Sequence, residues 1–278
     1  MKNSFLILLS ICLIIGCKKN DPEPKITLNF THTVDEIPLV IGTGCGDGGE
    51  CLPGHPCCNG EECLPYTNSA GQQYNVQTLN YIISDIKLHN TDGGSVLVKD
   101  IHFIDASDIS TLSLDIEIDF TDDITYNNIS FTMGLENSMN INNEYLNEDW
   151  HSTMVWPEMM GGGYHYMKLE GAYKTDSTFY NTHTGALETV DNPERTDHSF
   201  SCTRWSQMDP ALPPDHSVYD ILSETVITIN MEINNWFQNP NTFTLTNDGI
   251  MGDATKQAIL QANGQEDVFS IGWPANMP

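Results

Sequence analysis

Apolar and polar residues alternate strictly through much of the chain, and this pattern predicts β-strands. The alternating segments are residues 26–31, 82–88, 112–120, 129–135 and 227–233. A period of two is typical of strands that have one face in a core and the other in water. Clusters of Gly, Asp, Asn and Pro separate these segments, as turns do. Only 253–263 reads as a helix, with Asp253 as its N-cap and Gly264 following its end.

These elements predict one domain over residues 26–278. The sequence contains no internal repeat, and no stretch after residue 25 reads as a linker that divides the chain. We therefore expect an all-β fold, an antiparallel β-sandwich with long loops and a short C-terminal helix. Hydrophobic residues make up 39% of the 278 residues, which is enough for a core. The formal net charge of −27 repels nucleic acid and anionic lipid headgroups, so we exclude both as main partners.

The first 16 residues have the features of a bacterial export signal. Lys2 gives a positive start, and the apolar run 5–15 is too short to span a bilayer, which needs about 20 residues. Ile-Ile-Gly followed by Cys17 resembles a lipobox, which predicts cleavage before Cys17 and lipidation of its thiol. Residues 17–25 would then be a tether. We expect a protein of the bacterial outer membrane or cell surface, held to the membrane only by its lipid. The alternative is an ordinary secretory peptide with a chance cysteine.

Six cysteines remain after the signal and the lipid site, and they predict disulfide bonds. They are Cys45, Cys51, Cys57, Cys58, Cys63 and Cys202. Thiols of an exported protein meet an oxidising compartment, so six cysteines suggest three disulfides. Five lie in the Cys-rich insertion 44–64, and Cys202 is the long-range partner left for the fifth. A thiolate metal cluster is the alternative, although the spacing matches no tetrahedral zinc pattern.

Histidine and methionine are the candidate metal ligands. His32 continues the inward face of the first strand, and His183 stands at the end of a strand before Gly185. Between them, residues 150–160 hold two Trp, one His and three Met. Imidazole and thioether ligands suit copper, and Met favours the cuprous state. The alternative is structural: an inward His forms a hydrogen bond in the core, and Met fills gaps or covers a partner surface.

The sequence holds no G-x-S-x-G, H-E-x-x-H or phosphate-binding loop motif. Each of these motifs marks a familiar class of hydrolase or nucleotide-binding enzyme. We therefore expect a binding protein, not an enzyme.

Short motifs between residues 26 and 270 resemble those of the MbnP-like copper-binding proteins. The family patterns are YxISxIxL, IxFxxGvD, MxWxWxxGYxFxKLEG, HxG and an early FxH. They resemble, in that order, residues 81–88, 129–136, 154–171, 183–185 and 30–32, with Glu136 where Asp is usual. The chain departs from the family at Glu158, where the second Trp of W-x-W is usual, and in the insertion 44–64.

The resemblance implies an extracytoplasmic β-sandwich that binds copper through histidines, for copper acquisition or storage. Carried over to this chain, His32 and His183 are the expected ligands. The third ligand is expected among His151, Met154 and His198. Trp156 lies in the Met-x-Trp motif and is the expected site of oxidation to kynurenine. That modification implies a partner enzyme of the diheme cytochrome c peroxidase type.

Two other functions agree with the residues. One is a metal-independent surface recognition lipoprotein, which would bind protein or glycan through its loops. The other is calcium binding by the acidic loop 119–123.

Overall fold

A computed structural model describes residues 25–42, 64–90, 92–116, 126–174, 178–188, 197, 199–205 and 224–272. Several predicted features lie outside these residues: the signal peptide, Cys17, the acidic loop 119–123, His198, and all of the insertion 44–64 except Leu64. Among the six cysteines, only Cys202 is described, and its side chain is buried on β11. The predicted lipid anchor and disulfides therefore stay predictions.

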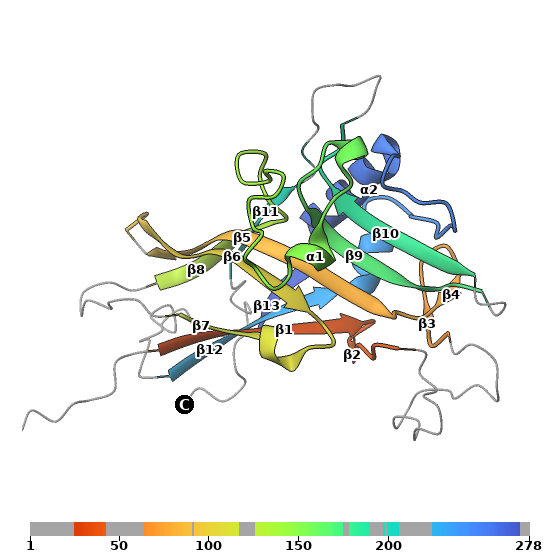
Figure 1. Ribbon diagram of the computed structural model, residues 1–278. Coiled ribbons are helices and arrows are strands. Elements are labelled where there is room, and N and C mark those ends of the chain that lie inside the picture. The colour runs from red at the N-terminus through yellow and green to blue at the C-terminus, as the bar shows by residue number, and fades with distance from the viewer. Residues whose placement is uncertain are drawn as a thin grey trace, which may run out of the picture.

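Two large β-sheets pack face to face (Figure 1). One has the strand order β13-β12-β1-β2, with β7 also paired to β1. Its strands are β1 (Lys25–Val34), β2 (Ile37–Pro38), β7 (Ser113–Ile116), β12 (Glu224–Glu232) and β13 (Phe269–Gly272). The other has the order β10-β9-β5-β8-β11, with β6 also paired to β5. Its strands are β5 (Thr78–Asn90), β6 (Ser95–Asp105), β8 (Tyr126–Met133), β9 (His165–Ala172), β10 (Phe179–Gly185) and β11 (Phe200–Trp205).

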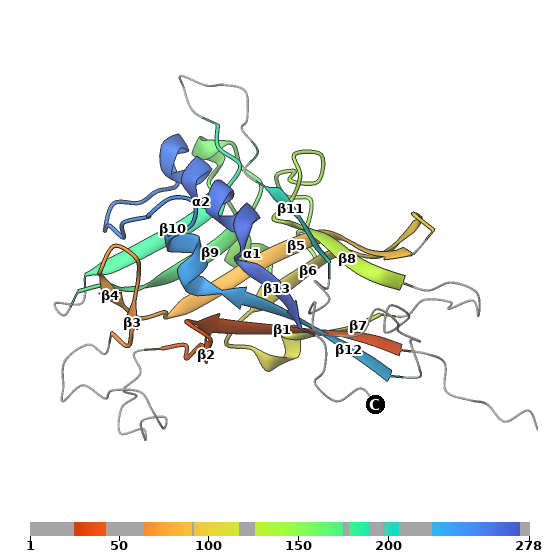
Figure 2. The ribbon, with the colours of Figure 1, turned by 180° about the vertical axis from the view of Figure 1, so that it is seen from behind.

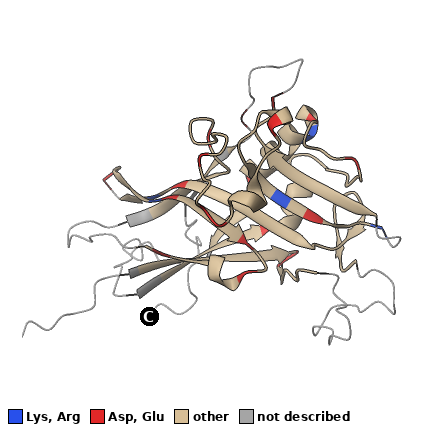
Figure 3. Ribbon diagram, in the orientation of Figure 1, with Lys and Arg blue, Asp and Glu red and all other residues tan. Residues whose placement is uncertain are grey.

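The remaining elements of the described residues are one small strand pair and five helical segments. A small separate pair consists of β3 (Tyr66–Thr67) and β4 (Gln73–Tyr74). The helical elements are η1 (Ile109–Thr111), α1 (His151–Met154), η2 (Glu158–Met160), η3 (Ile233–Phe237) and α2 (Ala254–Glu266). No helix of the described residues is long and apolar enough to cross a membrane. Acidic positions outnumber basic ones on the described elements (Figure 3).

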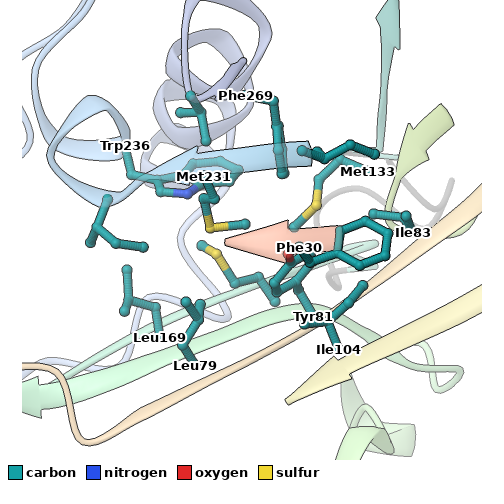
Figure 4. Packing of buried hydrophobic residues seen from close by; sticks show 14 of the residues in the cluster. Phe30, Leu79, Tyr81, Ile83, Ile104, Met133, Leu169, Met231, Trp236 and Phe269 are labelled. Carbon is teal, nitrogen blue, oxygen red and sulfur yellow. The ribbon is translucent and has the colours of Figure 1, made fainter. Parts of the chain in front are cut away.

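The main core lies between the two large sheets. Phe30 of β1 and Met231 of β12 face Tyr81 of β5 and Leu169 of β9 across the interior (Figure 4). All four side chains are at most 2% exposed. Burying these apolar faces removes their surface from water, which is the main force that stabilises a sandwich. The predicted all-β sandwich with a C-terminal helix is confirmed.

One strand pairing differs from the antiparallel prediction. β1 and β12 run parallel, with Leu28 opposite Ile227 and His32 opposite Met231. These strands come from opposite ends of the chain. Alternation shows that each has a buried face, but a period of two is the same in either direction.

The predicted C-terminal helix is found, and it is longer than expected. Asp253 caps its start by accepting a hydrogen bond from the Lys256 amide. The helix continues through Gly264 to Glu266, so Gly264 does not end it. Both Asn263 and Gly264 are buried there, and the Asn263 amide donates to the carbonyl of Trp236 on η3. Such tertiary contacts offset the weak helix propensity of glycine, about 1 kcal/mol against Ala.

A second apolar cluster covers the outer face of the six-stranded sheet, meaning the face turned away from the five-stranded sheet. Ile82 of β5 and Tyr166 of β9 contribute to it from the sheet. Trp150 and Met154 contribute from the covering segment, residues 134–164. Figure 1 shows α1 of this segment lying in front of β9. The covering segment therefore has a buried side of its own, as expected from its Trp and Met content.

Candidate metal centre

A β-bulge opens strand β9 and changes the direction of His165. Thr184 pairs with Met167, whereas the next residue, Gly185, pairs with His165. Tyr166 is therefore one extra residue on β9. Because an extra residue interrupts the alternation of side chains, His165 does not repeat the inward direction of Met167. Its ring lies next to those of Trp156 and His183 instead.

His183 projects from the outer face of β10. Its neighbour Thr184 pairs with Met167, which is part of the main core, whereas His183 itself pairs with Lys168. Since side chains alternate along a strand, His183 shares the outer face with Lys168 and Glu170, the charged residues of β9. Nε2 of His183 lies 2.6 Å from Oε1 of Glu170.

Three rings meet at this point of the outer face. The ring centroids of His165 and His183 are 4.9 Å apart, and the ring planes stand at 85°. The ring of Trp156 lies 4.8 Å from that of His165, at an interplanar angle of 69°. The bulge thus brings two imidazoles and one indole together.

The hydrogen bonding of His165 shows which of its ring nitrogens could bind a metal ion. Nδ1 lies 3.2 Å from the carbonyl oxygen of Met154. A carbonyl only accepts, so Nδ1 carries the proton and Nε2 carries a lone pair. Nε2 is buried and has no hydrogen-bond partner among the described residues. Burial, and secondly the neighbouring His183, lowers the pKa of His165 from 6.5 to about 3. This imidazole is therefore neutral at ordinary pH, in the form that binds metals.

His183 has a complementary arrangement. The Glu170 carboxylate accepts from Nε2, so Nε2 carries a proton, and Nδ1 is the nitrogen that bears the lone pair in the neutral imidazole. The hydrogen bond from His183 is also the main cause that lowers the pKa of Glu170. A carboxylate or a backbone carbonyl on the far nitrogen is the usual support of a metal-binding histidine, because it fixes the tautomer and the ring orientation. Both histidines have such support.

Trp156 is held firmly beside the pair. Its side chain is fully buried, and its Nε1 donates to the Met160 carbonyl at 3.1 Å. Its ring packs against Gly185, where an added Cβ would lie 2.7 Å from the ring carbons Cε3 and Cζ3. Only a residue without a side chain leaves room for the indole there. The predicted modification site therefore lies against His165, while its oxidation stays a prediction.

The structure places His32 apart from His183. His32 points into the main core, as predicted, and its Nε2 lies 3.1 Å from the Tyr81 hydroxyl. Burial lowers the pKa of His32 to about 4. His183 faces the opposite side of the six-stranded sheet, so the sheet separates the two side chains. The structure therefore does not bring His32 and His183 together.

The other expected ligands also contact residues outside the His165–His183 pair. Nδ1 of His151 lies 3.0 Å from the Tyr164 hydroxyl. The Met154 side chain is fully buried in the outer apolar cluster, and Met154 reaches the pair through its backbone carbonyl. His198 lies outside the described residues. Within those residues, no three His, Cys, Asp or Glu side chains gather around one point.

Sequence reasoning missed His165 and Glu170. Both lie in the segment that resembles GYxFxKLEG. Glu170 matches the acidic residue that the pattern specifies, whereas His165 stands at a position that the pattern leaves open. The motif thus contained the signal for Glu170. It contained none for His165, because the bulge that turns this residue is invisible in the local pattern.

Comparisons with known proteins agree with the fold. A solved structure described as MbnP from Methylosinus trichosporium resembles the chain with a TM-score of 0.54 and 13% sequence identity. The likeness covers 90% of this chain and 99% of the other. A search of curated proteins finds no match. A family model described as MbnP matches residues 23–253. Since that match spans most of the chain, the resemblance seen in the motifs is confirmed, and this protein belongs to the MbnP family.

Proposed function

We propose that this protein binds one copper ion as cargo at the His165–His183 pair, for copper acquisition or storage. One observation carries the proposal: Nε2 of His165 is buried without a hydrogen-bond partner among the residues that the structure describes, and the ring of His165 lies beside that of His183. A buried polar atom without a partner is uncommon in native proteins and needs an explanation. A metal ion between the two imidazoles supplies one.

The donor types favour copper over other metals. Calcium and magnesium prefer six or more oxygen ligands, and the pair offers neutral nitrogen. Structural zinc takes four ligands, whereas the described residues bring together only two imidazoles, with Glu170 already bonded to His183. Neutral imidazoles in a buried site suit copper. The predicted oxidation of Trp156 to kynurenine would add a carbonyl and an amine beside His165.

We further propose that the protein is a lipid-anchored binding protein of the cell envelope, without catalytic activity. The support for this is in the sequence: the export signal, the lipobox-like residues before Cys17, and the cysteine content. An envelope location would expose the site to copper outside the cytoplasm.

The test is copper stoichiometry by native mass spectrometry of the full chain. We expect one copper per wild-type chain and none in a variant that combines His165→Ala and His183→Ala. His32→Gln should keep its copper. A double variant that still binds one copper would rule out this site. A folded His32→Gln variant without copper would place the copper at His32 and contradict the proposed site.

The metal-independent recognition lipoprotein remains the second candidate. The covering segment exposes large apolar side chains, and Met159 is 88% exposed. Exposed apolar residues on loops are typical of binding surfaces. A wild-type protein that takes up no copper on titration would favour this function.

A further inference from the structure

The C-terminal helix α2 reaches the metal centre through one side chain, Gln257. Figure 2 shows α2 lying beside β10, the strand that carries His183. Gln257 is fully buried. Its Nε2 donates to the carbonyl oxygens of His183 at 2.7 Å and of Ile250 at 3.2 Å. Its Oε1 accepts from the Gly185 amide at 3.3 Å.

The side chain of Gln257 makes hydrogen bonds to β10 that a neighbouring strand would otherwise make. β10 is at the end of its sheet and pairs with β9 alone among the described strands. The His183 carbonyl and the Gly185 amide both point to the open side. A buried backbone group without a partner is costly, so each needs one. The amide of Gln257 satisfies the two groups at once and fixes the backbone on both sides of Thr184.

The two residues that Gln257 holds are the ones the metal centre depends on. His183 supplies an imidazole, and Gly185 is the surface on which the Trp156 ring packs. Glu170 orients the His183 ring, but it does not hold the backbone. Because Trp156 packs so tightly on Gly185, a small backbone shift there would move the indole relative to His165.

We propose that Gln257 is a positioning residue of the copper site and that it couples α2 to copper binding. The inference rests on the proposed function at His165 and His183. The family model matches residues 23–253, and α2 begins at Ala254, so Gln257 lies outside the matched range. Copper bound to the pair then stabilises the docked form of α2, since a ligand stabilises the state that binds it.

The test compares Gln257→Met, Gln257→Glu and a matched control, Gln261→Met. Met keeps the length of Gln and removes both hydrogen-bonding groups. Glu keeps the acceptor for Gly185 and, when protonated, one donor for His183. Gln261 lies one turn further along α2 and donates to the Ser199 carbonyl at 2.8 Å, so its loss leaves the pair untouched.

Cuprous affinity of the full-length protein is measured by competition with a colorimetric cuprous chelator. We expect Gln257→Met to weaken binding about 10- to 100-fold, as loss of a ligand's supporting partner does. Gln257→Glu should fall between Gln257→Met and wild type, and Gln261→Met should bind like wild type. Circular dichroism checks that each variant is folded. If Gln257→Met does not fold, the cuprous affinity of Gln257→Glu is compared with that of wild type instead.

Two further measurements distinguish positioning from general stability. The imidazole 15N signals of His183 in the copper-free protein should shift in Gln257→Met and not in Gln261→Met. Copper should slow hydrogen exchange of the α2 amides in wild type and in Gln261→Met, and not in Gln257→Met. A folded Gln257→Met that binds copper like wild type, with α2 still protected, overturns the inference and leaves the proposed function standing. A wild-type protein without copper uptake overturns both.

Discussion

The imidazole of His165 meets that of His183 edge to face, with centroids 4.9 Å apart, only because β9 carries one extra residue at Tyr166. In a regular strand, His165 would take the inward direction of Met167, while His183 takes the outward direction of Lys168. The bulge cancels this difference. Bulges that redirect a side chain are over-represented next to functional sites. The geometry of the pair leads to three predictions, and the burial of His32 in the main core leads to a fourth.

Glu170 should support copper binding without contacting the metal. Replacing it in Glu170→Ala removes the acceptor that fixes the His183 tautomer, and we expect a loss of about 10- to 100-fold in cuprous affinity. Competition titration measures it. Glu188 is an exposed carboxylate that follows β10. Its replacement in Glu188→Gln is the control and should leave the cuprous affinity at the wild-type value. Equal affinity in Glu170→Ala and wild type would show that His183 needs no carboxylate.

Met154 should contribute its carbonyl and not its sulfur. In Met154→Leu the carbonyl that accepts from His165 is kept, and the side chain stays apolar and similar in volume. We expect unchanged copper affinity and a loss of less than about 1.5 kcal/mol in the free energy of unfolding. Copper titration and urea unfolding measure the two quantities. Loss of copper from a folded Met154→Leu variant would identify the thioether as a ligand.

Gly185 should tolerate no side chain. The Cβ of Gly185→Ala would lie 2.7 Å from the Trp156 ring, so the indole or the strand must move. Overpacking of this kind costs about 1–3 kcal/mol, and we expect that loss in urea unfolding together with weaker copper binding. Gly249→Ala is the control, because no atom lies within 4 Å of its added Cβ. A Gly185→Ala variant as stable as Gly249→Ala would contradict the packing.

His32 should make the protein less stable as the pH falls. Burial lowers its pKa from 6.5 to about 4 in the folded state. Between these values the unfolded chain binds a proton that the folded chain does not, so acid favours unfolding, and the effect levels off below about pH 4. From pH 7.5 to 4.5, His32 should remove about 2.5 kcal/mol from the free energy of unfolding.

The check is a comparison of urea unfolding at the two pH values in wild type and His32→Gln. Glutamine cannot titrate and can still bond to the Tyr81 hydroxyl. The buried His165 and His102, whose pKa values burial also lowers, are present in both proteins, so their effects cancel in the comparison. His32→Gln should lose about 2.5 kcal/mol less than wild type does. Identical pH dependence in the two proteins would show that His32 is not a buried neutral group.

The sequence by itself determined the sandwich and its inward faces. Phe30 and His32 are buried on β1 as their alternation predicts, and Asp253 caps α2 as its side chain predicts. These features depend on residues two to four positions apart. The motifs also identified Trp156 and His183, whose rings both contact the ring of His165.

Only the tertiary structure decided how the strands and the site are assembled. The parallel pairing of β1 with β12, the bulge that turns His165 toward His183, and the approach of Gln257 to β10 all join distant parts of the chain. Alternation is a local property with the same period in every register and direction. Which strand pairs with which, and where one residue is extra, depends on the packing of both faces of the sheet at once.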